Sequence, residues 1–116
     1  MTKPIPKRGE IWFALLDKKR PVIVIQNDII TEFIQKQRLP LDIMAVPLTG
    51  KVNRWKNCTT SIFIKKDNIN NLDFDDIAKC HQVSTIQYKN YKYKIGCISE
   101  YQLAEIEKKV LWALNL

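Results

Sequence analysis

The clearest helical pattern in this sequence lies at its C-terminal end, and this restricts the folds that the chain can adopt. Ser99 with Gln102 three residues later forms a capping box, which marks the N-terminus of a helix. The apolar residues that then recur on one helix face are Leu103, Ile106, Val110 and Leu114. Charged residues largely occupy the opposite side. We therefore expect an amphipathic helix that covers one face of the remaining structure.

The residues before this helix form short segments rich in β-branched and aromatic side chains. They predict strands at residues 10–16, 22–25, 41–48, 57–64, 77–86 and 94–98. Residues 22–25 form a continuous β-branched run, typical of a central strand buried on both faces. A short helical turn is expected after Asn27 and Asp28, and Pro47 predicts a strand edge or a bulge. Many short strands followed by one helix favour a mostly β fold, a small SH3-like β-barrel with a C-terminal helix, over an alternating parallel sheet.

The length and the cysteine content limit the protein class further. A chain of 116 residues fits a single domain, here residues 1–116. No apolar run reaches the roughly 18 residues of a membrane span, and the N-terminus lacks a secretory signal, so we expect a cytoplasmic protein with no membrane partner. Cys58, Cys80, Cys97 and the single His81 lack the spacing of a zinc site. We predict no metal and no cofactor.

The net charge of +7 favours a polyanionic partner such as a nucleic acid. The alternative is an ordinary solvated surface. Two stretches combine cations with aromatic rings on which an unstacked base could rest, at residues 51–56 and 88–94. The alternatives are a solvated hairpin loop for the first, and a contact with an acidic protein segment or a cover over the core for the second.

Five segments carry a more specific signal because of their order. Residues 7–12 read KRGEIW and are followed by RPVIVIQND at 20–28, VPLTG at 46–50, AKCHQVSTI at 78–86 and a final strand and helix at 95–107. This series resembles the MazF/PemK toxins of type II toxin–antitoxin systems, from residue 7 to about residue 114. The resemblance implies their SH3-like barrel fold.

The resemblance also implies a metal-independent endoribonuclease, or mRNA interferase, that cleaves single-stranded RNA through attack of a ribose 2′-hydroxyl. The implied catalytic residues are Arg20 and Thr49. A guanidinium fork can hold the charge that builds on the phosphorus oxygens, and a threonine hydroxyl can bind such an oxygen or position the reacting hydroxyl. Gly50 next to Thr49 lets an RNA backbone approach closely.

We expect the substrate to contact residues around these two. The expected substrate-binding residues are Lys19, Asn27, Gly50, Lys51, Asn53, Arg54, Trp55 and Gln82. For Gln82, a buried structural amide is an equally good interpretation. The resemblance further implies a homodimer with RNA along its interface, and an acidic antitoxin whose disordered tail occupies the same groove.

Two departures from the family pattern leave other functions open. The loop between the first two strands, residues 15–19, is short and lacks the glycines of the usual loop. His81 and Ser84 replace residues that are usually acidic and basic, so the groove is differently charged. The alternative functions are a non-catalytic binding module like a topoisomerase-inhibiting toxin, or a general nucleic-acid-binding barrel.

Overall fold

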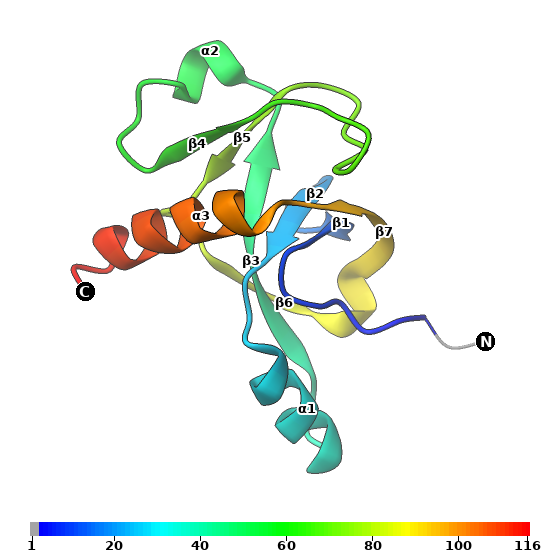
Figure 1. The fold of residues 1–116 in the computed structure, drawn as a ribbon. Coiled ribbons are helices and arrows are strands. Elements are labelled where there is room, and N and C mark those ends of the chain that lie inside the picture. The colour runs from blue at the N-terminus through cyan, green and yellow to red at the C-terminus, as the bar shows by residue number, and fades with distance from the viewer. Residues whose placement is uncertain (1–2) are drawn as a thin grey trace.

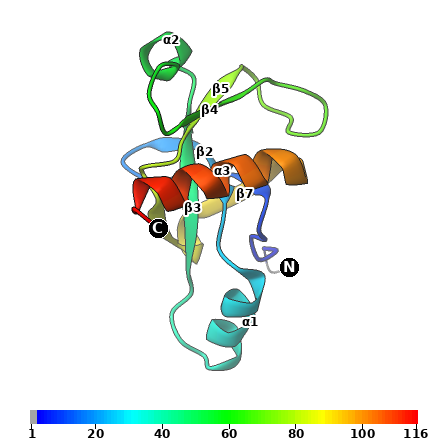
Figure 2. The same cartoon turned by 60° about the vertical axis from the view of Figure 1, so that its left-hand side comes forward.

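Seven antiparallel strands and a C-terminal helix dominate the computed structural model, which describes residues 3–116 (Figure 1). The elements are β1 (Glu10–Leu15), β2 (Lys19–Val24), α1 (Asp28–Lys36), β3 (Asp42–Thr49), α2 (Val52–Trp55), β4 (Ser61–Ile64), β5 (Asp76–Lys79), β6 (Ser84–Gln87), the 3-10 helix η1 (Tyr88–Asn90), β7 (Tyr91–Cys97) and α3 (Glu100–Ala113). The predicted mostly β fold with a C-terminal helix is confirmed. Helices α1 and α2 lie at opposite ends of the molecule (Figure 2).

Strand β3 organises the sheet because it pairs with three other strands. The strand order is β4-β5-β3-β2-β1-β7, and β6 pairs with β3 outside this path. The first half of β3 pairs with β6, and Leu48 and Thr49 at its end pair with β5. Pro47 lies between these two pairings and opposite Val22 of β2. The sequence predicts a strand edge or a bulge here, and Pro47 has no ladder partner on the side where β3 changes from β6 to β5.

The loop between β4 and β5 contacts β7 and so joins the two ends of the sheet. The Cys97 amide donates to the Ile69 carbonyl at 3.3 Å, and the Asn71 side-chain amide donates to the Ile95 carbonyl at 3.1 Å. Gly96 lies against the backbone of Ile69 and Asn70, so closely that a Cβ there would be 2.5 Å from either carbonyl oxygen. We call this contact between the loop and β7 the seam.

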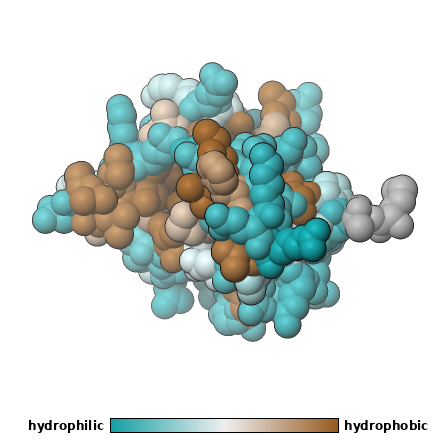
Figure 3. All heavy atoms as spheres, turned by 90° about the horizontal axis from the view of Figure 1, so that it is seen from below, coloured by the Kyte–Doolittle hydropathy of each residue, from teal (hydrophilic) through white to brown (hydrophobic). Residues whose placement is uncertain are grey.

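Helix α3 begins as the sequence predicts. The Ser99 hydroxyl accepts from the Gln102 amide at 3.1 Å, and the Gln102 side chain accepts from the Ser99 amide at 3.2 Å, which completes the capping box. Ile106 is fully buried. Leu114, expected on the same buried face, is 60% exposed because the helix ends at Ala113 and its last turn extends beyond the sheet. Figure 3 shows hydrophobic surface on the side where this end of α3 lies in Figure 1.

Removing this cap is expected to destabilise the protein measurably. Ser99→Ala leaves the Gln102 amide without its side-chain acceptor and should lower the free energy of unfolding by about 1 kcal/mol. Ser99→Thr keeps the hydroxyl and should lose less than half as much. Urea denaturation followed by circular dichroism measures both, and equal losses in the two variants would show that the cap is not the cause.

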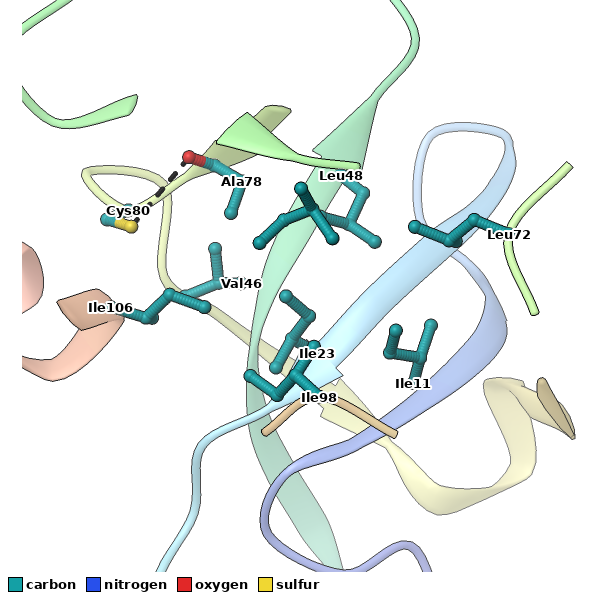
Figure 4. Packing of buried hydrophobic residues seen from close by; sticks show 10 residues of the cluster. Ile11, Ile23, Val46, Leu48, Leu72, Ala78, Cys80, Ile98 and Ile106 are labelled. Atoms are coloured by element: carbon teal, nitrogen blue, oxygen red, sulfur yellow. Dashed lines mark hydrogen bonds between the residues drawn. The ribbon is translucent and has the colours of Figure 1, made fainter. Parts of the chain in front are cut away.

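The core consists of two clusters that use alternate residues of the same strands. Ile23 lies in one cluster, whereas Val22 and Val24 lie in the other, so the prediction that residues 22–25 are buried on both faces is confirmed for these three. Figure 4 shows Ile106 of α3 and Leu72 of the β4–β5 loop on opposite sides of the first cluster. The loop is therefore part of the core as well as the surface.

Three predicted elements need correction. Residues 77–86 form two strands, because the chain turns after Lys79, where the Gln82 amide donates to its carbonyl, and β6 then crosses to pair with β3. In the segment 57–64 only Ser61–Ile64 is a strand. The residues before it form a turn, in which the Ser61 amide donates to the Cys58 carbonyl. The last strand starts at Tyr91, before the predicted 94. The predicted helical turn after Asn27 is confirmed as α1, with Asn27 as its N-cap.

Candidate active site

A cavity of about 630 Å³ opens where β2 begins and β3 ends. Its walls come from the β1–β2 turn, the end of β3, the β4–β5 loop and β7. The cationic residues that line it are Lys18, Lys19, Arg20, Lys51 and Lys94. Asp73 and Asp76 are its acidic residues, and Phe13, Phe74 and Tyr93 add aromatic surface. The cavity therefore combines a positive balance of charge with aromatic rings, as a site for a phosphate-bearing ligand requires.

Arg20 lies at the start of β2, opposite Ala14 of β1. One guanidinium nitrogen bonds both carboxylate oxygens of Asp17, at 2.9 and 3.2 Å. The Arg20 side chain is only 16% exposed, and its Nε has no hydrogen-bond partner within residues 3–116. The short β1–β2 turn thus orients the guanidinium through Asp17, and the donor left for a ligand is Nη1, which is not among the fully buried atoms and makes no hydrogen bond within the described residues.

Thr49 and Gly50 end β3 in the wall of the same cavity. The Thr49 hydroxyl accepts from the Lys51 amide at 3.2 Å, so its own proton remains available. A Cβ at Gly50 would lie 3.6 Å from the Asp76 carboxylate, which shows how closely that carboxylate approaches the end of β3. Of the predicted site residues, Lys19, Arg20, Thr49, Gly50 and Lys51 share one cavity.

The remaining predicted residues lie outside this cavity. Asn53 and Arg54 are exposed on α2. Asn27 caps α1 by accepting from the Ile29 amide at 2.8 Å, at the end of the molecule opposite α2. Gln82 is exposed in the turn after β5, so its interpretation as a buried structural amide is wrong. The buried amide belongs to Gln26, which bonds Thr31, Asp42 and Met44.

Trp55 is already engaged by neighbouring side chains. Its half-buried ring has the Lys79 ammonium 5.2 Å from its centroid and the His81 ring 5.6 Å away. The Nδ1 atom of His81 is in turn 2.8 Å from the Thr60 hydroxyl oxygen. One face of the Trp55 ring is consequently taken by Lys79, and His81 does not line the cavity.

Lys79 is a cation that sequence patterns did not indicate as buried. It lies in β5 with 7% of its surface exposed. Burial lowers the pKa of its ammonium group, and the positive charges of Arg20, Arg54 and Lys18 lower it further, against the opposing effect of Asp17. Lys79 therefore extends the positive field of the cavity toward α2.

The tyrosines of residues 88–94 differ in their roles. Tyr91 is fully buried and donates to the Ile43 carbonyl at 2.8 Å, so it belongs to the core. The Tyr88 hydroxyl donates to backbone carbonyls of the N-terminal segment. Tyr93 is exposed and lines the cavity, stacked on Phe13 with ring centroids 5.4 Å apart. One member of this stretch is therefore placed to meet a ligand.

Asp76 is the site residue that the sequence reading missed, because it lies at the end of an acidic segment that looks like a solvated loop. In the structure it is the first residue of β5 and only 7% exposed. Burial, together with the nearby charges of Asp75 and Asp73, raises the pKa of its carboxyl group from 3.8 to about 6.

This raised pKa has a consequence for stability. The folded protein keeps the Asp76 proton up to about pH 6, whereas the unfolded chain releases it near pH 4, so this group lowers the free energy of unfolding as the pH rises between these values. Asp76→Asn should therefore be more stable than the wild type at pH 7.5, by about 1 to 2 kcal/mol, and nearly equal to it at pH 4. Urea denaturation at the two pH values measures this, and a less stable variant at pH 7.5 would contradict the expectation.

Comparison with known proteins agrees with the fold. Residues 7–114 match the family described as PemK-like, MazF-like toxin of type II toxin–antitoxin system. A Mycobacterium tuberculosis toxin, MazF-mt6, superimposes with a TM-score of 0.74 at 21% identity, over 92% of this chain and 97% of that one. MazF from Deinococcus radiodurans superimposes with a TM-score of 0.77 at 12% identity, over 98% and 100% of the two chains.

A mycobacterial structure described as an endoribonuclease is similar as well, with a TM-score of 0.71 at 17% identity over 100% of this chain and 97% of that one. These similarities show the fold, a small β-barrel, and here it carries a basic cavity at the start of β2. The chain belongs to the PemK-like, MazF-like toxin family of type II toxin–antitoxin systems.

Proposed function

We propose that this toxin is a metal-independent endoribonuclease that cleaves single-stranded RNA, mRNA in the cytoplasm, with Arg20 and Thr49 as catalytic residues. The observation that carries the proposal is that Arg20 and Thr49, which lie far apart in the sequence, line one basic cavity. The family and the mycobacterial endoribonuclease of the same fold support it.

The cavity offers the groups that this reaction needs at a phosphodiester. When a ribose 2′-hydroxyl attacks the adjacent phosphorus, negative charge grows on the non-bridging oxygens. The Nη1 donor of Arg20 can bind one of these oxygens, and the Thr49 hydroxyl can donate to another. Gly50 adds no side chain between β3 and the RNA backbone. This arrangement stabilises the transition state without a metal ion.

The lysines around the cavity support binding of the flanking phosphates. Lys18, Lys19 and Lys51 are exposed at its rim, with Lys94 on the β7 side. Binding of these lysines releases counterions from the RNA, and this release is less favourable at high salt. Affinity for single-stranded RNA should therefore fall steeply as the salt concentration rises. The Phe13–Tyr93 stack offers a ring surface for an unpaired base.

The decisive experiment is cleavage of a long single-stranded RNA in EDTA by the wild type and by Arg20→Ala, with the new ends mapped and their chemistry identified. Cleavage by the wild type alone, leaving 2′,3′-cyclic phosphate and 5′-hydroxyl ends, would support the proposal. Salt-sensitive binding without any product would instead favour a nucleic-acid-binding module on the same barrel.

We further propose that the cavity binds the acidic segment of an antitoxin, which would block RNA. A MazE–MazF structure from Deinococcus radiodurans is similar to this chain, with a TM-score of 0.76 at 12% identity over 98% of this chain and 99% of that one. The cluster of lysines and Arg20 suits a carboxylate-rich peptide as well as a phosphate chain. An acidic peptide that competes with RNA in wild-type protein, and does so less in Lys51→Glu, would support this.

The C-terminal end of α3 supports the proposed homodimer. Its exposed apolar residues are Leu111, Trp112, Leu114 and Leu116, and they account for hydrophobic surface seen in Figure 3. Contiguous apolar surface of this kind is a usual feature of an interface.

Trp112→Glu should therefore shift the protein from a dimer to the 13.6 kDa monomer in light scattering. Tyr101→Glu is the matched control, because Tyr101 is also an exposed aromatic residue but lies at the other end of α3. A dimer that persists in Trp112→Glu would place the interface elsewhere.

A further inference from the structure

We propose that Asp76 is the general base of this reaction and that its carboxylate accepts the proton of the attacking ribose 2′-hydroxyl. This inference rests on the proposed RNA cleavage and adds to it a catalytic residue that neither the sequence motifs nor the comparisons indicate.

Asp76 lies beside the two residues proposed to bind the reacting phosphate. It lines the same cavity as Arg20 and Thr49. Its chain neighbour Ile77 pairs directly with Thr49 across the β3–β5 ladder, and its carboxylate lies next to Gly50. A phosphodiester held by Arg20 and Thr49 would therefore present an adjacent ribose within the reach of Asp76.

The carboxylate has no partner that would explain its burial. Within residues 3–116 it makes no hydrogen bond and no ion pair with a side chain or the backbone, although the residue is only 7% exposed. Its oxygens are not among the fully buried unpartnered atoms of residues 3–116, so they face the cavity, and the burial of most of the residue still makes the charged form costly. A ribose hydroxyl in the cavity would supply the missing donor.

Other groups near the cavity are less suited to accept this proton. Arg20 is a guanidinium, which stays protonated in proteins. His81 lies outside the cavity, beside Thr60 and Trp55. Asp73 lines the cavity but is exposed, on the loop before β5.

The reaction balances with Asp76 as the base. The 2′-oxygen forms a bond to phosphorus, the bond from phosphorus to the 5′-oxygen breaks, and the 2′-hydroxyl proton passes to Asp76. The leaving 5′-oxygen takes a proton from water, and the hydroxide that remains takes the proton from Asp76. The products are a 2′,3′-cyclic phosphate and a 5′-hydroxyl.

The electrostatic surroundings of Asp76 suit this role at neutral pH. The charged groups that face the cavity are Lys18, Lys19, Arg20, Lys51, Asp73 and Lys94, and Asp75 precedes Asp76 in the chain. Burial, with Asp75 and Asp73, raises the pKa of Asp76 to about 6. Such a group is ionised at pH 7 yet is a stronger base than an ordinary carboxylate.

The test measures single-turnover cleavage from pH 5 to pH 8.5, on an RNA that carries the cleavage site mapped for the wild type. The wild-type rate should rise with pH and level off above an inflection near pH 6. Asp76→Asn should cleave about 100-fold more slowly at pH 7.5 and lose the inflection. Its affinity for the same RNA with a 2′-O-methyl group at the cleavage site should be unchanged or higher.

Asp75→Asn is the matched control, because Asp75 does not line the cavity while its charge raises the pKa of Asp76, so the variant removes a neighbouring charge and leaves the proposed base in place. It should keep the plateau rate to within about threefold and move the inflection to lower pH. If the wild type cleaves and Arg20→Ala does not, but Asp76→Asn matches the wild type at every pH, the assignment of Asp76 is wrong while the proposed function stands. If the wild type leaves RNA intact, both are wrong.

Discussion

Arg20→Lys is expected to lower the single-turnover rate of RNA cleavage by about 100-fold although it keeps the positive charge, and Arg20→Ala by about 1,000-fold. The loss in the lysine variant follows from geometry. The guanidinium binds Asp17 through Nη2 and retains a donor at Nη1, whereas an ammonium group on a flexible stem cannot hold both partners in a fixed plane. Because Asp17 is exposed, losing the ion pair should cost little stability.

The same RNA and the same protein preparation allow a direct control. Arg38→Lys makes the same chemical change at an exposed position after α1, at the end of the molecule away from α2, and should cleave at the wild-type rate. Thermal melting should show all of these variants folded. Wild-type activity in Arg20→Lys would mean that the site needs only a positive charge at this position.

Gly96→Ala is expected to cause the largest loss of stability among the three possible glycine-to-alanine changes. A Cβ at this position would lie 2.5 Å from the carbonyl oxygens of Ile69 and Asn70 and 2.7 Å from the Asn70 carbonyl carbon. These are backbone atoms, so no side chain can rotate away, and the loop must shift from β7. We expect the free energy of unfolding to fall by about 3 kcal/mol or more, or the protein to fail to fold.

Gly50→Ala is the matched comparison for this prediction. Its added Cβ would meet the Asp76 carboxylate at 3.6 Å, an ordinary contact distance, so the change in stability should stay below about 1 kcal/mol. Urea denaturation of both variants measures the difference. Equal stability of Gly96→Ala and the wild type would show that the seam can widen at little cost.

The elements that the sequence predicts well are those whose patterns depend on neighbours along the chain. The Ser99 capping box and the run of residues 22–25 are local patterns, and the structure keeps both. The division of residues 77–86 into β5 and β6 depends instead on β3, which is long enough to pair with each in turn. No local pattern in those residues encodes the position of a distant strand.

The candidate site shows the same limit more strongly. Arg20 and Thr49 were selected by resemblance, and the cavity brings them together. Asp76 could not be selected, because it is buried only when β5 pairs with β4 and β3, which removes it from an acidic loop. The burial of Lys79 could not be predicted either, because lysine is rarely buried. Only the Trp55 ring and the surrounding strands account for its position.

The seam has a mechanical consequence for ligand binding. The loop that packs on Gly96 also carries Asp73 and Phe74 and leads into Asp76, so the segment that joins the sheet ends is also one wall of the cavity. No strand ladder holds this junction, and a local separation there costs less than unfolding the barrel. Each such opening carries Asp73 and Phe74 away from β7, while the β5 ladders keep Asp76 beside Thr49. A ligand that touches both walls therefore holds the two ends of the sheet together. The more tightly it binds, the more strongly the seam amides should be protected from hydrogen exchange.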